Sequence, residues 1–309
     1  MTDHAKGYAL GAIAAATYGM NPLFALPLYA DGMNPDSVLL FRYLLAIPVV
    51  AAMVAARGQN FTVKRQLLAP LAVLGLLMAF SSLALFLSYN HMDAGIASTL
   101  LFVYPVMVAV IMAAMFRERI GAVTVICIAT ALAGILLLYN GPDGATLSAV
   151  GTTLVILSAL AYAIYIVAVN RPAMKQVATL TLTLYVLAAG AMLFIVRLCT
   201  VAPLTLPSRW YLWGCLAALA LFPTAISLLC TTRAIQYIGS TPTAILGALE
   251  PVTAVVIGVT VFGERIGGRE IAGLILIVGA VTLVVGGDSV SQRLLRFRKM
   301  FPRKKDGKK

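Results

Sequence analysis

A series of apolar stretches, each about 20 residues long and almost free of charge, constrains the fold more than any other feature of this sequence. A helix of about 20 apolar residues is long enough to span the hydrocarbon core of a bilayer. Of the 309 residues, 61% are hydrophobic and only 11% are charged, whereas soluble chains carry about 25% charged residues. We therefore predict an all-α membrane protein.

The apolar runs predict ten transmembrane helices in two sets of five. The first of them is followed by further spans, so we expect a retained helix rather than a cleaved signal peptide. The expected ranges are 7–30, 36–56, 67–90, 94–116 and 120–140 in the first half, and 147–169, 178–199, 210–236, 239–263 and 267–287 in the second.

Most Lys and Arg residues lie in alternate connecting segments and in the tail 288–309, which alone holds nine of them. By the positive-inside rule, both termini are expected in the cytoplasm of a bacterium, with the spans in its inner membrane. The basic tail is expected to rest on anionic lipids. Topology thus accounts for the net charge of +12, which therefore does not indicate a nucleic-acid partner. Nothing in the sequence indicates an oligomeric state.

The two halves of the chain are related in sequence. A shift of 146 residues aligns ten identical pairs within the 22 positions that begin at Leu100, among them Pro105 with Pro251. The run Glu-Arg-Ile-Gly at 118–121 likewise aligns with the same run at 264–267. Shared apolar composition does not account for such a match, so we interpret the halves as homologous repeats.

The expected repeats cover residues 1–142 and 147–287 and contain five helices each. Because five is odd, a repeat that starts inside ends outside, and its copy then runs in the opposite direction. Inverted repeats are typical of secondary transporters, whose binding sites lie near the midplane between the two repeats.

Glu250 is the strongest candidate for a functional residue, because it lies in the middle of the ninth apolar run. A charged group at the centre of a membrane helix costs about 2.5 to 3.5 kcal/mol on insertion scales. One interpretation is a site for a substrate cation or a proton. The other is a residue that locks the bundle by hydrogen bonds at the helix break expected at Pro251.

Tyr104 is the repeat counterpart of Glu250, since it precedes Pro105 as Glu250 precedes Pro251. The two side chains are expected to line one cavity from opposite sides. Each proline removes a backbone hydrogen bond and is expected to break its helix there. For Tyr104 itself, a simple packing kink is an equal alternative.

A polar interruption in the first apolar run consists of Tyr18, Asn21 and Pro22. It predicts a discontinuous helix, and such breaks often mark binding sites in transporters. Asn21 could equally serve as a hydrogen-bond donor between helices.

Two arginines, Arg42 and Arg233, also lie within expected spans. We expect Arg42 to pair with Asp36 or with an anionic group of the substrate. Arg233 lies near the expected inner surface, where its side chain can extend to water, and we favour a structural role for it.

Several patterns count against other kinds of site. The Glu-Arg pairs at 118–119 and 264–265 fall at expected turns, and the four cysteines lie singly in apolar runs. There is no Gly-rich phosphate loop and no cluster of ligands at metal spacing. We therefore predict no catalytic residues, no metal site and no cofactor.

In these motifs the chain resembles the EamA-type members of the drug/metabolite transporter superfamily, from about Gly7 to Gly287. One departure is Tyr18-Gly19, where many relatives have Trp-Gly. The motifs that carry the resemblance are Gly11 to Asn21, Phe41-Arg42-Tyr43-Leu44-Leu45-Ala46, Tyr104-Pro105, Glu118-Arg119-Ile120, Ala159 to Arg171, Leu249-Glu250-Pro251 and Gly263-Glu264-Arg265.

The resemblance implies a ten-helix carrier with inverted repeats, usually an exporter of a small molecule. Three alternatives stay open: a flippase for a lipid-linked sugar or lipid head group, an importer of a cofactor-like metabolite, and a membrane-embedded enzyme. The enzyme would need a second acid, base or nucleophile at the depth of Glu250.

Overall fold

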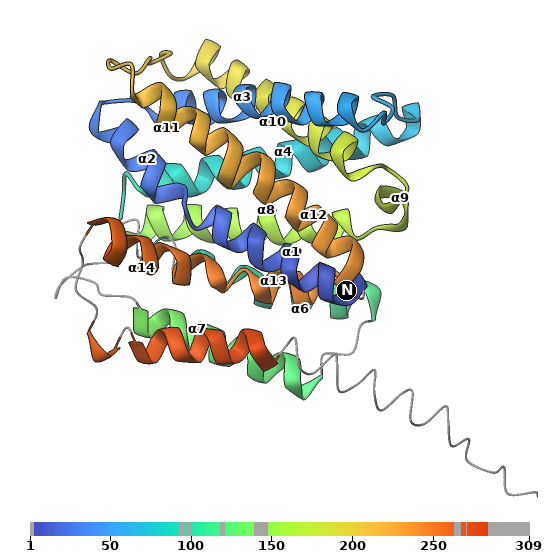
Figure 1. Cartoon of the computed structure of the whole chain (residues 1–309), viewed down its shortest axis with the longest axis vertical. Coiled ribbons are helices and arrows are strands. Elements are labelled where there is room, and N and C mark those ends of the chain that lie inside the picture. The colour runs from blue at the N-terminus through green and yellow to red at the C-terminus, as the bar shows by residue number, and fades with distance from the viewer. Residues whose placement is uncertain are drawn as a thin grey trace, which may run out of the picture.

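A computed structural model of the chain describes residues 3–92, 97, 100–117, 121–138, 148–262, 267–269 and 271–283. The predicted tail 288–309 and the Glu-Arg turns at 118–119 and 264–265 lie outside these residues. Every regular element in the described part of the chain is helical (Figure 1). The elements are α1 (Asp3–Tyr18), α2 (Asn21–Ala30), α3 (Pro35–Ala56), α4 (Arg65–Ser88), α6 (Tyr104–Phe116), α7 (Ala122–Leu138), α8 (Ala149–Val169), α9 (Pro172–Lys175), α10 (Thr179–Thr200), α11 (Leu212–Leu219), the π-helix η1 (Ala220–Ile226), α12 (Ser227–Ile238), α13 (Ser240–Leu246) and α14 (Leu249–Phe262), followed by an unlabelled helix at Ile271–Leu283.

Seven helical stretches in the described residues are long and apolar enough to cross a membrane. They coincide with seven of the predicted spans to within a few residues at most ends. Three shorter apolar helices, Tyr104–Phe116, Ala122–Leu137 and Ile271–Leu283, lie where the remaining three spans were expected. The observed architecture is therefore an all-helical bundle with at least seven spans.

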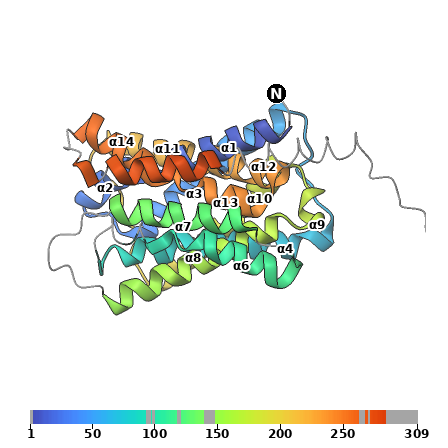
Figure 2. The ribbon, with the colours of Figure 1, turned by 90° about the horizontal axis from the view of Figure 1, so that it is seen from below.

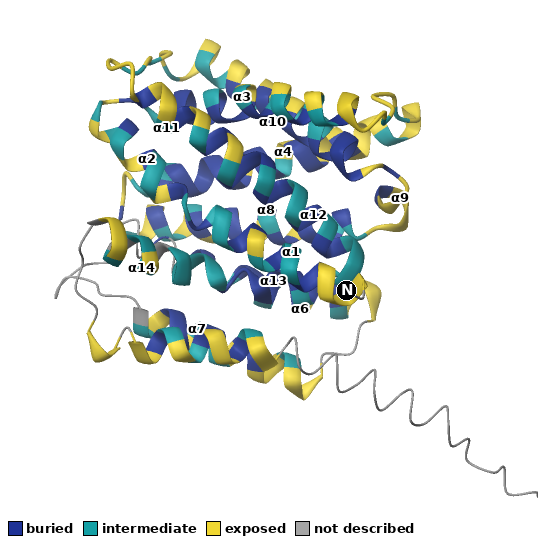
Figure 3. Ribbon diagram, in the orientation of Figure 1, coloured by how far each residue is buried: buried dark blue, intermediate teal, exposed yellow. Residues whose placement is uncertain are grey.

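The helices lie roughly side by side in one bundle, with α4 and α8 on the face opposite α1 and α14 (Figures 1 and 2). α7 and the helix Ile271–Leu283 pair along one edge, where the backbone of Gly273 packs close to Gly134. Many large apolar side chains remain exposed, including those of Met115, Leu136 and Ile275. Exposed and buried positions alternate along most of the helices (Figure 3). Helices that are apolar on both their buried and their exposed faces are suited to a lipid surrounding.

The packing is symmetric when the two sequence repeats are exchanged. In the order of the repeats, α1 corresponds to α8, α3 to α10, α4 to α12 and α6 to α14. α4 packs against α8, and their counterparts α12 and α1 also pack against each other. In the same way, α6 packs against α8, and their counterparts α14 and α1 are in contact. α3 packs against its own counterpart, α10. This exchange supports the relation between the halves that the 146-residue shift indicates.

Candidate functional site

The first span is interrupted between α1 and α2, as the polar residues there predict. α1 ends at Tyr18, α2 begins at Asn21, and Gly19 and Met20 form a turn between them. Pro22 occupies the first turn of α2, where a missing N–H breaks no helical hydrogen bond. The break therefore places the side chains of Tyr18 and Asn21 beside an interruption in the backbone.

Arg42 on α3 forms hydrogen bonds that connect this break with α3 and η1. Its side chain is only 1% exposed. Nη1 donates a hydrogen bond to Oδ1 of Asn21 at 3.0 Å, Nη2 donates to the carbonyl oxygen of Pro223 at 3.0 Å, and Nε donates to Oγ1 of Thr224. The guanidinium carbon lies 5.7 Å from the centre of the Tyr18 ring, a cation–π distance. One buried arginine thus joins the first span, α3 and η1.

Both acceptors on η1 lie where the helix is locally widened. Pro223 lies inside the π-helix and has no N–H to donate, so the regular ladder of backbone hydrogen bonds is interrupted there. The carbonyl oxygen of Pro223 itself accepts from Arg42. Neither Pro223 nor Thr224 was identified from the sequence, although a proline inside an apolar run is a signal that could have pointed to them.

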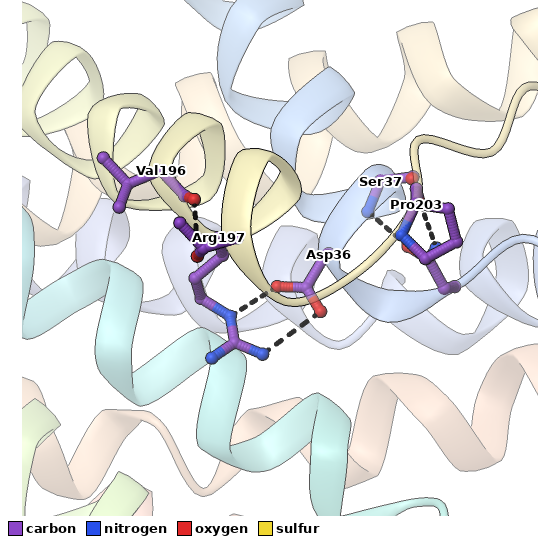
Figure 4. A network of polar contacts seen from close by, with 7 residues as sticks. Asp36, Ser37, Val196, Arg197 and Pro203 are labelled. Atoms are coloured by element: carbon purple, nitrogen blue, oxygen red, sulfur yellow. Dashed lines mark hydrogen bonds and ion pairs between the residues drawn. The ribbon is translucent and has the colours of Figure 1, made fainter.

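Of the two partners expected for Arg42, Asp36 was wrong. Asp36 pairs instead with Arg197 of α10, with 2.6 Å between Oδ1 and Nε and 3.4 Å between Oδ2 and Nη2 (Figure 4). The physical reason is the packing of α3 against α10, which brings the first turn of α3 beside the last turn of α10. No carboxylate in the described residues forms an ion pair with Arg42.

The Asp36–Arg197 pair belongs to a polar network at one end of the bundle. Ser37 accepts a hydrogen bond from the backbone N–H of Thr205 at 2.9 Å, and the side chain of Asn34 donates to the carbonyl oxygen of Pro203 at 2.6 Å. Nearby, the side chain and backbone of Ser208 donate to Asp31 and hold the pKa of that carboxyl below its ordinary value. The segment after α2 is thereby tied to the segment after α10.

The helix breaks predicted at the two repeat-related prolines are both present. The backbone turns at Phe102 and Val103 before α6, and at Gly247 and Ala248 before α14. Pro105 and Pro251 then lie in the first turns of α6 and α14, where their rings are tolerated. Tyr104 and Glu250 consequently occupy equivalent positions, one at the start of each helix.

Tyr104 and Glu250 line one small internal cavity, as the repeat relation predicts. Its volume is about 10 Å³, room for about one water molecule. Small residues of α1 form part of its wall. The polar residues that line it are Tyr104, Tyr162, Ser227, Thr231, Thr243 and Glu250. Tyr162, Ser227, Thr231 and Thr243 were not identified from the sequence, because isolated hydroxyl groups in apolar runs carry no pattern.

The carboxylate of Glu250 receives no hydrogen bond and forms no ion pair with any residue that the structure describes. Its main chain, by contrast, is closely packed. A Cβ atom placed on Gly19 would lie 2.4 Å from the carbonyl oxygen of Glu250. The break in the first span therefore rests directly against the break before α14, and only a glycine allows this approach.

The predicted residues thus fall into two neighbouring groups. Asn21 and Arg42 are bonded to each other, and Tyr18 lies against Arg42. Tyr104 and Glu250 share the cavity. Tyr18 links the groups, since it is close enough to interact electrostatically with both Arg42 and Glu250. A separate cavity beside Pro105 is lined by apolar residues alone.

Comparison with known proteins agrees with this architecture. A relative from Bacillus subtilis (strain 168), named as the uncharacterized transporter YcbK, is 26% identical over 288 residues, which cover 90% of this chain and 88% of the relative. A protein of known crystal structure covers 94% of this chain and 99% of its own, with a TM-score of 0.80 at 19% identity. That likeness concerns the fold alone.

The family model of EamA-like transporters matches the chain twice, at residues 5–140 and 149–286. The two matches correspond to the two repeats and together cover most of the chain. The protein is therefore a multi-pass membrane protein that belongs to the EamA-like transporter family of the drug/metabolite transporter superfamily.

Proposed function

We propose that this protein is a secondary carrier that exports a small metabolite across the bacterial inner membrane by alternating access. In this proposal ten spans form two inverted five-helix repeats, and both termini lie in the cytoplasm. The cargo binds between the repeats, at the cavity beside α6 and α14. The family supports transport of small molecules, and the exchange symmetry of the packing supports two equivalent states of one bundle.

The observation that carries the proposal is Glu250. A carboxylate inside a membrane bundle is costly and is usually retained for function. Glu250 lines a cavity and lacks a hydrogen-bonding or ionic partner among the described residues. A residue that served only to lock the bundle would be expected to make such bonds. The unpaired carboxylate therefore supports a role in binding cargo.

Metabolite profiling of cells and growth medium tests the proposal without knowledge of the cargo. Cells that lack the protein are compared with cells that produce the wild type, Glu250→Gln or Asp31→Asn, at equal amounts of protein in the membrane. We expect at least one compound to accumulate in the medium with the wild type and with Asp31→Asn, whose carboxylate lies at the surface. With Glu250→Gln its export should fall by about tenfold or more.

If Glu250→Gln exports the compound at the wild-type rate from pH 5 to pH 9, the proposed role of Glu250 is wrong. If no compound accumulates in the medium with the wild type but one is depleted from the medium, the direction of transport is the reverse of that proposed.

A further inference from the structure

The charge of the cavity beside Glu250 restricts what it can bind. Glu250 is the one charged residue among those that line the cavity in the described part of the chain. The nearby cation, Arg42, does not line it, and three of its five N–H groups bind Asn21, Thr224 and the carbonyl oxygen of Pro223. When Glu250 is ionised, the cavity therefore has a negative charge without a counter-ion among the described residues, and a cationic guest would supply one.

The hydroxyl groups around the cavity restrict further which chemical groups it can bind. Ser227 donates its hydrogen to the carbonyl oxygen of Ala14 at 3.0 Å, and Thr243 donates to that of Gly239 at 2.7 Å. Tyr104 likewise donates to the carbonyl oxygen of Ala244 at 3.2 Å. A hydroxyl whose hydrogen is committed to a carbonyl still has lone pairs that can accept. These three groups thus offer acceptors, which suit a guest that donates hydrogen bonds.

Two tyrosine rings, those of Tyr104 and Tyr162, also line the cavity. Tyr104 and Tyr162 lie edge to face, with 4.9 Å between their ring centres, and Tyr165 stacks on Tyr162 at 6.2 Å. The face of a tyrosine ring attracts a cation. The packing is tight, because a Cβ atom on Gly247 would lie 1.7 Å from the hydroxyl oxygen of Tyr104. The cavity volume of about 10 Å³ admits only a small head group.

We propose that this cavity binds the primary ammonium group of the cargo, so that the cargo belongs to the class of small primary amines. The ammonium group supplies three N–H donors, Glu250 balances its charge, and Ser227 and Thr243 accept hydrogen bonds. A quaternary ammonium group has the charge but no donors, and a carboxylate or phosphate would meet acceptors and a like charge. The assignment of the amine as cargo rests on the proposed function.

Calorimetric titration of the purified full-length protein in lipid nanodiscs tests the head group directly. The probes are propylammonium, propyltrimethylammonium, 1-propanol, propionate and the zwitterion 3-aminopropionate. We expect propylammonium to bind at least about tenfold more tightly than each of the others, since a hydrogen bond to a charged group corresponds to about tenfold or more in affinity. Glu250→Gln should weaken its binding by a similar factor.

Two threonines provide a matched pair of variants. Thr243 and Thr260 both donate to the carbonyl oxygen four residues earlier, but only Thr243 lines the cavity. Thr243→Val should weaken binding of propylammonium by about tenfold and leave that of propyltrimethylammonium unchanged. Thr260→Val should alter neither. Thermal unfolding of each variant confirms that it is folded. Loss of a hydrogen-bond acceptor should weaken binding of propylammonium alone, whereas a general distortion of the cavity should weaken binding of both cations.

The proposal is overturned if propyltrimethylammonium binds as tightly as propylammonium, if propylammonium does not bind, or if Glu250→Gln leaves its affinity unchanged. Tighter binding of 3-aminopropionate than of propylammonium also overturns it, because the extra carboxylate would then have a cationic partner. If profiling identifies a cargo without an amine, this inference fails while the transport function stands. If propylammonium binds but is not moved across proteoliposomes, the ammonium site stands and the transport proposal fails.

Discussion

Replacement of Arg42 by Met is expected to destabilise the bundle, because it removes the hydrogen bonds that join three segments. Arg42 donates to Asn21 on α2, to Pro223 and to Thr224, and its side chain is almost completely buried. Hydrogen bonds between membrane helices average about 0.6 kcal/mol and reach about 1.7 kcal/mol. Three such bonds predict a decrease of about 2 to 5 kcal/mol in the free energy of unfolding.

The change also removes a buried charge, and the relief of its desolvation cost offsets part of the loss. A double-mutant cycle with Asn21→Leu separates the two effects, because the desolvation of Arg42 cancels in the coupling energy. We expect a coupling of about 0.5 to 2 kcal/mol. Arg42→Lys keeps the charge but loses the planar fork of donors, so it should fall between the wild type and Arg42→Met.

The assay is reversible unfolding by a denaturing detergent from mixed micelles, followed by circular dichroism. Arg233→Met on α12 is the matched control, since the hydrogen bond recorded for Arg233 is a long one, 3.5 Å, to Gln236 within the same helix. If Arg42→Met lies within about 0.5 kcal/mol of Arg233→Met, the bonds of Arg42 do not hold the three segments together and the reasoning is refuted.

Two further perturbations test the packing. Gly75→Ala should lower the unfolding temperature, because its Cβ atom would lie 2.6 Å from the carbonyl oxygen of Val186. Gly214→Ala is the control, since its Cβ atom would meet nothing within 4 Å, and it should leave the unfolding temperature unchanged or raise it. Equal thermal shifts for the two variants would contradict the packing of α4 on α10. Asp36→Asn should lower the free energy of unfolding by about 1 kcal/mol in the same micelle assay, because the pair with Arg197 loses one of its charges. In a double-mutant cycle with Arg197→Gln, a coupling energy near zero would show that the pair does not contribute to stability.

The helices and the repeat-related positions could be predicted from the sequence, because both follow from periodic patterns along the chain. The apolar runs indicated the helices, and the repeat shift indicated that Tyr104 and Glu250 occupy equivalent positions beside a proline. Both line one cavity, and each lies in the first turn of its helix just after a break. Tyr18, Asn21 and Pro22 likewise predicted the interruption in the first span. These inferences needed only local chemistry and the relation between the halves.

The partners of the buried charges could not be inferred in this way. Asp36 lies six residues from Arg42 but 161 residues from Arg197, and the nearer arginine is the obvious partner in sequence. Which one it meets depends on how α3 and α10 pack against each other. The acceptors for Arg42 depend in the same way on a π-helix at Pro223 in another span. Tertiary packing, rather than local pattern, determines both.

These contacts also change the role that we assign to Arg42. A residue that receives an anionic substrate group needs access to the cargo, yet Arg42 is 1% exposed and three of its five N–H groups already bind other residues. Its contacts instead hold Asn21 and the Tyr18 ring beside the break at Gly19, and that break rests on the carbonyl oxygen of Glu250. Arg42 is therefore better placed to position the backbone around Glu250 than to touch the cargo. A positioning role predicts that Arg42→Lys lowers stability and transport together, without changing which head groups the cavity prefers.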